Sequence, residues 1–304
     1  MTRRILVTGA AGMLGSELLL RVPSDCAAIG TDLRAAGAGA PAVAAVGIDL
    51  ADDAAVAKLW REHGPFDGVI HGAAYTAVDQ AETEEALALR VNATACAVLA
   101  RACARAGVPL VAVSTDFVFD GEGVRDASGA VRPYREDDPP RPLAAYGRTK
   151  LAGELLALAE HPRGTRIART QWLYGPRGKH FPGTIVRAAK EKGALRVVDD
   201  QRGAPTTTLE LAPALWDLVR ADAPSGIYHA ACEGVCSWYD LAKASLEEAG
   251  LAHVPCDPCK TAEFPRPAKR PAYSALDAGK LAALRGRRLK SWREALRDFF
   301  AAGA

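Results

Sequence analysis

Short apolar segments alternate with longer amphipathic segments through the first part of the chain, and this alternation constrains the fold more than any other feature. Several short segments are apolar at consecutive positions, which is typical of parallel strands buried on both faces. Amphipathic segments between such strands indicate βαβ units and a doubly wound parallel α/β sheet. We expect strands at residues 4–8, 27–32, 46–49, 68–74, 110–115 and 166–170, and helices at 13–21, 52–63, 82–106 and 145–159.

The pattern changes after residue 172, where Pro-rich segments separate the predicted helices. We predict that residues 1–172 form the sheet domain, joined by returning segments from about 198–230. Residues 173–304 are expected to form mainly a smaller C-terminal lobe that covers one end of the sheet and binds the substrate. Its helices are expected at 183–192, 209–220, 238–249 and 291–301.

Composition excludes several classes of function. Lys and Arg number 38 against 36 Asp and Glu, and the net charge of +2 does not suggest a nucleic-acid surface. No apolar run of about 18 residues occurs, so we expect no membrane-spanning helix. The stretch MTRRILVTG reaches a glycine loop too early for a signal peptide, and we therefore expect a cytoplasmic protein.

The seven cysteines are an odd number, which fits reduced thiols in a cytosol. Cys232, Cys236, Cys256 and Cys259 form CxxxC and CxxC pairs, a spacing at which zinc ligands also occur. Pro258 lies inside the second pair and no zinc-knuckle sequence surrounds it. We therefore interpret the four as ordinary thiols and assign no metal site.

Gly9, Gly12 and Gly15 stand between the first predicted strand and the first predicted helix. Glycine lets a ligand approach the backbone closely, and the free N–H groups of a helix N-terminus favour a phosphate. The GxxGxxG spacing differs from the GxGxxG fingerprint, and the alternative is a tight turn that only packs helix against strand. Because the motif lies at the first strand–helix junction, we favour a Rossmann-type dinucleotide site.

Two acidic residues follow the next predicted strands. Asp32 is placed to accept a hydrogen bond from an adenosine ribose hydroxyl, which favours NADH. Arg34 could instead face a 2′-phosphate, so the sequence leaves the choice between NADH and NADPH open. Asp49 follows the third strand, and it either contacts the adenine amino group or caps the next helix.

Tyr146 and Lys150 are four residues apart on a predicted helix, so both side chains lie on one face. A nearby ammonium and the positive nicotinamide ring both stabilise a phenolate, and we expect Lys150 together with that ring to lower the pKa of Tyr146. Tyr146 could then protonate a carbonyl oxygen as hydride reaches the carbon, while Lys150 holds the nicotinamide ribose. Thr115 ends a predicted strand, where ligands bind in open α/β sheets, and its hydroxyl could contact the same carbonyl. YxxxK alone is a weak signal, because many amphipathic helices contain it; its order after the glycine loop and the strand end favours catalysis.

Segments along almost the whole chain resemble the extended short-chain dehydrogenase/reductases, and within them the dTDP-4-dehydrorhamnose reductase family. These segments are TGAAGMLGSEL, AAYTAVDQAE, VNATACAVLA, VSTDFVFDG, PLAAYGRTKLAGE, RTQWLYG, DDQRGAPTTTLELA, GIYHAA and RPAYSALDAGKL. The resemblance implies hydride transfer from NADPH or NADH to the C4 ketone of a nucleotide sugar, dTDP-4-dehydro-L-rhamnose. It implies that Thr115, Tyr146 and Lys150 are the catalytic residues.

The resemblance also implies roles for further residues. Asn92 would order water or backbone near the active site, whereas its alternative role is that of a solvent-side helix residue. Contacts to the sugar are implied for Thr76, Val78, Asp116 and Trp172. Besides the glycine loop, contacts to the cofactor are implied for Met13, Leu14, Asp32, Asp49, Leu50, Ala73, Ala74, Thr76, Tyr146 and Lys150.

The chain departs from the family pattern at several positions. Phe117 stands where tyrosine is frequent, which removes a hydroxyl near the sugar, and His71 is either a packing residue or a proton shuttle. Some members form a homodimer with a magnesium ion held by glutamates. Glu17 and Glu210 match two such positions but we find no third, so we assign no metal ligands, and Mg²⁺ and the dimer rest on the resemblance alone.

Two other functions fit the same residues. A reductase or epimerase for another nucleotide-linked deoxy-ketosugar would use the same chemistry, because the second lobe selects the substrate. The regulatory subunit of methionine adenosyltransferase also resembles these reductases and acts by binding a partner. The presence of Thr115, Tyr146 and Lys150 together argues against this non-catalytic function.

Overall fold

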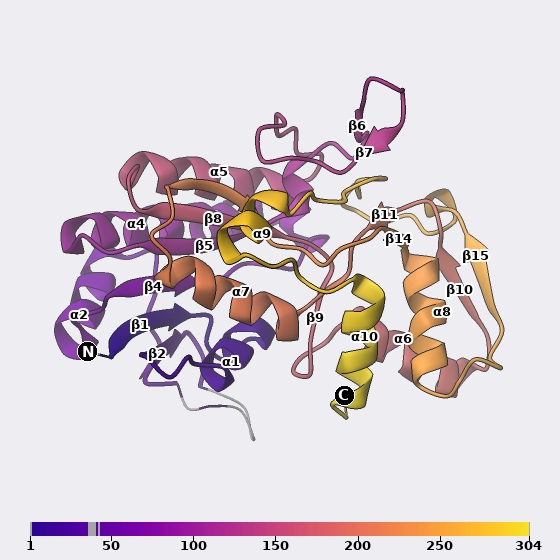
Figure 1. Cartoon of the computed structure of the whole chain (residues 1–304), viewed down its shortest axis with the longest axis horizontal. Helices are drawn as coiled ribbons and strands as arrows, with labels where there is room; N and C mark the ends of the chain where they lie inside the picture. Colours follow the sequence, from indigo (N-terminus) through magenta and orange to yellow (C-terminus); the bar gives the residue numbers. More distant parts are fainter. Residues whose placement is uncertain (1, 36–40, 42, 304) are drawn as a thin grey trace.

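The computed structural model describes residues 2–35, 41 and 43–303, which form a large parallel sheet between helices and a second group of shorter elements (Figure 1). Within these residues the sheet has seven strands in the order β13-β8-β5-β4-β1-β2-β3. The chain builds outward from β1 in one direction and then from β4 in the other, which confirms the predicted doubly wound sheet. The strands are β1 (Arg3–Thr8), β2 (Cys26–Asp32), β3 (Ala45–Val46), β4 (Gly68–His71), β5 (Leu110–Thr115), β8 (Thr165–Thr170) and β13 (Gly226–His229).

Successive residues of the strands pack against opposite helix layers. Ile5 and Val7 of β1 belong to one apolar cluster, with helices α1 (Met13–Leu20), α7 (Thr208–Arg220) and α9 (Gly279–Arg285). Leu6 belongs to another, with α2 (Asp53–His63), α4 (Ala95–Ala106) and α5 (Ala145–Glu160). Figure 1 shows these two helix groups on the two sides of the sheet. Burial on both faces explains why the strands are apolar at consecutive positions.

The helix predicted at residues 82–106 begins later and contains an irregular turn. Helix α3 (Glu85–Leu89) leads through a π-helical turn at Arg90–Thr94 into α4. Glu82 stays outside α3, in a short 3₁₀ turn, and its carboxylate accepts a hydrogen bond from the N–H of Ala145 (2.8 Å). Glu82 thereby caps α5, whose own cap residue makes no side-chain hydrogen bond.

Two predicted strands end earlier than expected. The third strand contains only Ala45–Val46, so Asp49 lies in the connection to α2. Helix α2 begins after Asp52, whose carboxylate accepts hydrogen bonds from the N–H groups of Ala54 (2.8 Å) and Ala55 (3.4 Å). The fourth strand ends at His71, because residues 72–74 leave the sheet and pass beside the glycine loop.

The second group of elements lies at the carboxyl ends of the strands and includes a pair of strands that the sequence did not predict. Strand β13 of the sheet and helix α9 beside it were not predicted either. Helices α6 (Phe181–Lys192), α8 (Trp238–Glu248) and α10 (Trp292–Ala301) pack with a parallel pair, β10 (Leu195–Val198) and β15 (Cys256–Cys259). The prolines around β15 led us to predict a loop there. Pro258 is tolerated in the strand because β15 pairs with a neighbour on one side only, as an edge strand does. Helix α9 is too short for a clear helical pattern. The remaining short strands are β6 (Val124–Arg125), β7 (Val131–Arg132), β9 (Leu173–Tyr174), β11 (Arg202–Gly203), β12 (Thr206–Thr207) and β14 (Cys236–Ser237).

The chain returns from the second group of elements to the large sheet at α7 and β13. Strand β13 pairs with β8, so its residues complete the edge of the sheet although they lie far along the sequence. The domain boundary at residue 172 stays a prediction.

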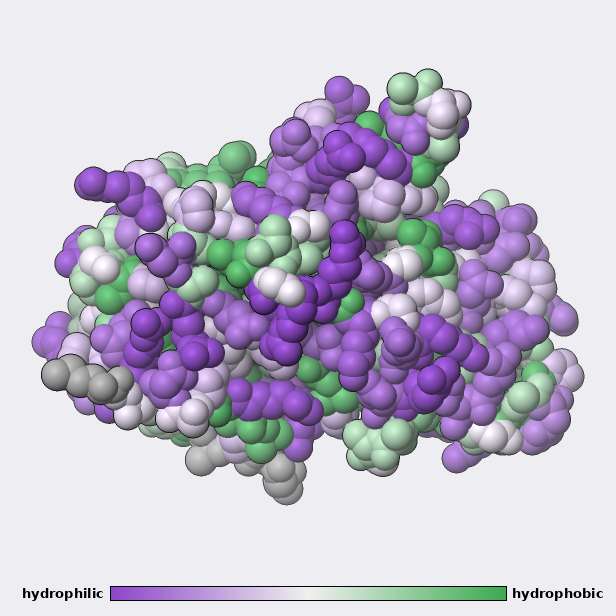
Figure 2. All heavy atoms as spheres, viewed as in Figure 1, coloured by the Kyte–Doolittle hydropathy of each residue, from purple (hydrophilic) through white to green (hydrophobic). Residues whose placement is uncertain are grey.

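The hydropathy of the surface and of the longest helix shows whether the described part of the chain has a candidate membrane-spanning segment. Figure 2 shows mostly hydrophilic residues on one face of the molecule, with apolar residues in small separate groups. In the described part of the chain, one helix, Glu85–Ala106, is long and apolar enough to cross a membrane by length and composition alone. Core helices pass the same test, and 56% of its most apolar stretch is buried inside the protein. This helix packs against the sheet and α5, as a core helix does.

Candidate active site

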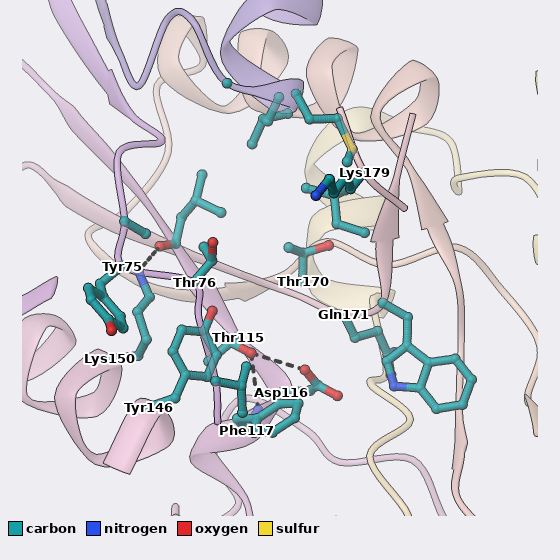
Figure 3. Close-up of a pocket in the computed structure, with 18 of the residues that line it drawn as sticks. Tyr75, Thr76, Thr115, Asp116, Phe117, Tyr146, Lys150, Thr170, Gln171 and Lys179 are labelled. Atoms are coloured by element: carbon teal, nitrogen blue, oxygen red, sulfur yellow. Dashed lines mark hydrogen bonds between the residues drawn. The ribbon is translucent and has the colours of Figure 1, made fainter. Parts of the chain in front are cut away.

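One large cavity opens at the carboxyl ends of the sheet strands and extends toward the second group of elements (Figure 3). Its volume is about 1470 Å³, whereas sites for one small ligand measure roughly 300–1000 Å³. The cavity therefore has room for a dinucleotide and a second ligand. All of the residues to which the sequence assigned catalytic, cofactor or sugar contacts line it: Gly9, Gly12, Met13, Leu14, Gly15, Asp32, Asp49, Leu50, Ala73, Ala74, Thr76, Val78, Thr115, Asp116, Tyr146, Lys150 and Trp172.

The glycine loop joins β1 to α1 in a shape that needs glycine at two of its positions. Gly9 has φ +68°, and a Cβ atom there would lie 2.7 Å from the backbone nitrogen of Ala73. A Cβ on Gly15 would lie 2.1 Å from the carbonyl oxygen of Gly9. Gly12 precedes the first helical residue, and the first turn of α1 contains no acidic side chain. The N–H groups at this end of α1 therefore face the cavity in a form that suits a phosphate.

Asp32 and Asp49 line the cavity beyond the glycine loop. The Asp32 carboxylate accepts hydrogen bonds from the N–H groups of Ala11 (3.0 Å) and Arg34 (3.1 Å), which fix its orientation at the end of β2. Asp49 accepts from the N–H of Ala51 (2.9 Å) and pairs with Arg90 (2.5 Å). The alternative role of Asp49 as a helix cap is wrong, because another residue caps α2. Contact with the adenine group stays a prediction.

Thr115, Tyr146 and Lys150 come from the end of β5 and the start of α5. The Lys150 ammonium is buried and donates a hydrogen bond to the carbonyl oxygen of Val113 (2.7 Å). Helix α5 approaches β5 so closely that a Cβ on Gly147 would lie 2.1 Å from the carbonyl oxygen of Phe117. Figure 3 shows Tyr146 between Lys150 and Thr115 in this view, on one wall of the cavity. A carbonyl group at this wall could contact both hydroxyls.

The pKa of Tyr146 differs from the sequence prediction. Burial raises this pKa to about 12, against a smaller lowering by the hydrogen bond with Thr115. The Lys150 ammonium points to a backbone carbonyl, and burial lowers its own pKa. The expected lowering of the phenol pKa by Lys150 is therefore absent in the protein alone. Tyr146 stays protonated at neutral pH, which is the form that a proton donor needs.

Polar groups without a protein partner face the cavity near this wall. Asp116 Oδ2, Thr170 Oγ1 and Gln171 Nε2 are buried and have no hydrogen-bond partner among the described residues. Buried polar atoms are nearly always satisfied, so Thr170 Oγ1 and Gln171 Nε2 are available to ligand hydroxyls, whereas the Ser274 hydroxyl lies beside the Asp116 carboxyl group. Burial raises the pKa of Asp116 to about 6. The sequence assigned Asp116 to the sugar but assigned no role to Thr170 and Gln171, which lie at and just after the end of β8.

Trp172 follows these residues and has an unusual backbone conformation. Its φ is +46°, a value that bulky residues rarely adopt. Its ring stacks on Trp238 of α8 with centroids 3.7 Å apart and planes 9° from parallel. Both rings line the cavity. A strained backbone of this kind persists only where the surrounding structure holds it in place. The stack with Trp238 holds the Trp172 ring in this way, and the two rings form an aromatic wall between the sheet and α8.

Asn92 and His71 are both buried close to the site. Asn92 accepts from the N–H of Tyr75 (2.8 Å) and donates to the hydroxyl of Thr149 (3.1 Å), so the solvent-side alternative is wrong. It ties the loop after β4 to α5 and thus orders backbone beside the site. His71 shares a hydrogen bond with Thr8 (2.7 Å), and burial lowers its pKa to about 3. A neutral, enclosed imidazole fits the packing alternative.

The acidic residues implied for magnesium do not fit that ion. Glu17 is buried and pairs with Arg21 and with Arg177 (3.3 Å). The carboxylate of Glu210 lies 3.9 Å from the Lys290 ammonium. Side-chain cations therefore occupy the positions around both carboxylates. Among the described residues no group of three His, Cys, Asp or Glu side chains converges as a metal site would.

The four paired cysteines do not converge. Cys232 and Cys236 belong to different apolar clusters, and Cys256 packs in a third. All seven cysteines of the chain are free thiols, and each is at least partly buried.

The outer part of the cavity is rich in cations that the sequence analysis missed. They come from the loop before α6, from β10 and from the segment after β15, far apart in the sequence. Scattered single basic residues in polar loops carry no pattern, so only the fold brings them together. The cavity is lined there by Lys179, Arg196, Arg266, Lys269 and Arg270. Such a group suits a ligand with a diphosphate.

The geometry defines a class of protein. A doubly wound sheet with a glycine loop after β1, a threonine at the end of β5 and YxxxK on the following helix is the arrangement of short-chain dehydrogenase/reductases. A sequence model of the family described as the RmlD substrate binding domain matches residues 3–304. The chain belongs to this family, the dTDP-4-dehydrorhamnose reductases.

Individual relatives match over almost their whole length. The dTDP-4-dehydrorhamnose reductase of Mycobacterium tuberculosis is 43% identical, and the match covers 100% of this chain and 94% of that protein. A probable dTDP-4,6-dihydroxy-2-methyloxan-3-one 4-ketoreductase of Streptomyces antibioticus is 41% identical over 98% of this chain and 94% of that protein. The crystal structure of dTDP-4-dehydrorhamnose reductase from Bacillus anthracis in complex with NADP superposes with a TM-score of 0.87 at 34% identity, covering 99% of this chain and 100% of that chain.

Proposed function

We propose that this chain reduces the C4 ketone of dTDP-4-dehydro-L-rhamnose to the alcohol of dTDP-L-rhamnose, with NADPH or NADH as the hydride donor. One observation supports it above the others. The protonated phenol of Tyr146 and the hydroxyl of Thr115 lie on the wall of a single cavity that is large enough for a dinucleotide and a nucleotide sugar. Membership of the reductase family supports the same substrate.

Each residue has a separate part in the proposed reaction. The reduced nicotinamide supplies hydride to the ketone carbon when it is bound. Thr115 donates a hydrogen bond to the ketone oxygen, and Tyr146 gives it a proton, so that the carbonyl becomes a secondary alcohol. Lys150 holds a ribose hydroxyl with its ammonium. Solvent returns a proton to the Tyr146 phenolate after the transfer.

The cofactor preference follows from the end of β2. Asp32 accepts two backbone hydrogen bonds and is placed for the adenosine ribose. Arg34 is exposed and lines the same part of the cavity, so its guanidinium can pair with a 2′-phosphate. We propose that the protein uses both cofactors and that Arg34 supports NADPH. The Bacillus anthracis relative, which binds NADP, supports this view.

The outer cations support a nucleotide-linked substrate. Arg196, Arg266 and Lys269 line the cavity, and Arg196 also pairs with Glu263. A diphosphate would neutralise part of this positive charge. The stacked rings of Trp172 and Trp238 offer an apolar face to a sugar or a base.

A second candidate is the reduction of another nucleotide-linked deoxy-ketosugar. The Streptomyces antibioticus relative has a name that specifies a different ketosugar, at nearly the same identity as the rhamnose enzymes. A panel of dTDP-4-ketosugars, assayed at equal concentration, separates the candidates. A clear preference in kcat/KM for the rhamnose precursor supports the first proposal, whereas equal or higher values for another sugar support the second.

The proposal is tested by the loss of NAD(P)H absorbance when the protein meets dTDP-4-dehydro-L-rhamnose. We expect oxidation by the wild type and roughly 10²–10⁴-fold slower oxidation by Tyr146→Phe, with cofactor binding retained. Near-normal turnover by Tyr146→Phe would mean that another group is the acid. Cofactor binding without turnover of any ketosugar, together with a stable complex with another protein, would support the regulatory function. The cytoplasmic location and the homodimer stay predictions.

A further inference from the structure

The segment between β15 and α9 lines the cavity, and an acidic residue of the loop after β4 pairs with it. We call residues 261–271 the strap. Phe264, Pro265 and Arg266 of the strap line the same cavity as Thr76 and Val78, which follow β4. The strap overlaps the sequence PRPAKRPAYSALD, and the loop after β4 contains YTAVDQAE. None of the residue roles proposed above requires these two segments to be in contact.

Asp79 is the residue at which the strap and the loop meet. Its carboxylate accepts two hydrogen bonds from the Arg270 guanidinium, the one to Oδ2 at 2.9 Å, and a third from the N–H of Ala268 (3.2 Å). Arg270 also donates to the carbonyl oxygen of Ala268 (2.6 Å), and Ala268 is buried. Arg266 adds a longer contact of 3.8 Å to the same carboxylate. Asp79 therefore organises three positions of the strap at once.

The contact between Asp79 and Arg270 differs from an ordinary surface ion pair. Side-chain exposures are 31% for Asp79 and 21% for Arg270, and the contact is bidentate. Paired charges of this geometry are stronger and more directional than exposed lysine pairs. Hydrogen bonds from Arg270 hold the pKa of Asp79 below its usual range, so the carboxylate stays ionised at neutral pH.

The contact between Asp79 and Arg270 holds the positive charges of the strap at the outer part of the cavity. Arg266, Lys269 and Arg270 all line the cavity, and Asp79 neutralises one of these three cations. The remaining two positive charges match the charge of a nucleotide diphosphate bridge. At its other end the strap is fixed by the Asp200 carboxylate, which accepts a hydrogen bond from the N–H of Thr261 (3.0 Å).

We propose that Asp79 is a positioning residue for the nucleotide-sugar substrate: its bidentate contact with Arg270 holds the strap across the cavity and places the cations Arg266 and Lys269 against the diphosphate. This inference rests on the proposed function, because it needs a nucleotide-linked substrate. Asp79 itself does not belong to the residues that line the cavity. Its loss weakens substrate binding and leaves the dinucleotide half of the cavity intact.

The test compares variants of the contact with a matched ion pair elsewhere. Asp79→Asn and Arg270→Met break the contact, and Arg270→Lys keeps the charge without the bidentate geometry. Asp25→Asn is the control, because it breaks the pair of Asp25 with Arg220 (2.9 Å) at side-chain exposures of 47% and 32%, remote from the cavity. We expect Asp79→Asn and Arg270→Met to raise KM for the nucleotide sugar about tenfold, and Arg270→Lys to give an intermediate value.

A purely structural role would not produce this pattern. The Kd for NADPH, followed by nicotinamide fluorescence, should change less than about twofold in every variant, and Asp25→Asn should keep the wild-type KM. The inference is overturned if Asp79→Asn keeps the wild-type KM. It is also overturned if KM for the sugar and Kd for NADPH rise together, since Asp79 would then support the whole cavity.

A calorimetric titration with dTDP separates this inference from the proposed function. If the wild type reduces no ketosugar, the proposed function fails, whatever the variants do. Weaker dTDP binding by Asp79→Asn than by wild type and Asp25→Asn would still support the positioning role. Equal dTDP affinities in the three proteins would overturn it.

Discussion

Glu154 and Arg169 form an ion pair that is almost sealed from solvent, with side-chain exposures of 2% and 1%. The Arg169 guanidinium donates to both carboxylate oxygens of Glu154 (2.9 and 2.6 Å), and the Ser114 hydroxyl donates to one of them. Arg169 Nη1 has no hydrogen-bond partner among the described residues. Glu154→Gln removes the negative charge and leaves the guanidinium buried without a counter-ion. We expect the free energy of unfolding to fall by roughly 3–5 kcal/mol.

A matched variant of another ion pair made by α5 shows whether burial is the cause. Glu85→Gln breaks the bidentate pair between Glu85 and Arg148 on the outer side of α5, where the side-chain exposures are 43% and 45%. That pair is screened by solvent, so its loss should cost less than about 1 kcal/mol. Denaturant unfolding, followed by tryptophan fluorescence, measures both losses on the same scale.

The double variant Glu154→Gln/Arg169→Met tests whether the unpaired buried charge causes the loss of stability. It removes both charges, so no uncompensated charge stays buried, and part of the lost stability should return. A loss in Glu154→Gln no larger than that in Glu85→Gln would refute the argument. A double variant less stable than the single one would refute it as well, because packing rather than charge would then explain the loss.

Three further predictions concern the site. Lys150→Met should weaken both NADPH binding, measured by fluorescence titration, and turnover; unchanged affinity would show that Lys150 does not hold the cofactor. Arg34→Ala should raise KM for NADPH about tenfold and leave KM for NADH nearly unchanged, and equal changes for the two cofactors would contradict a 2′-phosphate contact. Burial raises the pKa of Asp116 from 3.8 to about 6, so the folded protein binds the proton more tightly and stability falls as pH rises through this range. Asp116→Asn removes this penalty and should raise Tm at pH 7.5 but not at pH 3.5; equal shifts at both pH values would show that ionisation of Asp116 is not the cause.

The sheet and one wall of the site could be predicted because their signals are local. Consecutive apolar positions mark buried parallel strands, and Tyr146 and Lys150 share a helix face by their spacing alone. The roles of Gly9 and Gly15 could be predicted in the same way, because each glycine lets two neighbouring segments approach closely. These features depend on a few adjacent residues, and the structure changes their boundaries by only a few positions.

The remaining features depend on partners that are distant in the sequence. Glu82 caps α5 rather than its own helix, and Asp79 pairs with Arg270, 191 residues away. Nothing near these carboxylates indicates which donor they will meet. The lowering of the Tyr146 pKa that we expect from Lys150 is absent in the protein alone for the same reason, because the pattern shows that Lys150 is near but not that its ammonium points to a backbone carbonyl.

Helix α5 explains how this protein can keep one reaction while the opposite wall of its cavity varies. Glu82 caps its start, the hydroxyl of Thr149 accepts a hydrogen bond from Asn92, and Lys150 reaches the backbone of β5. One turn further, Glu154 joins it to β8 through Arg169. Every one of these contacts lies within the sheet domain, and together they fix the phenol of Tyr146 against Thr115. None of these contacts involves the strap or the aromatic wall, so substitutions there can alter the sugar that is bound while the proton donor stays in place.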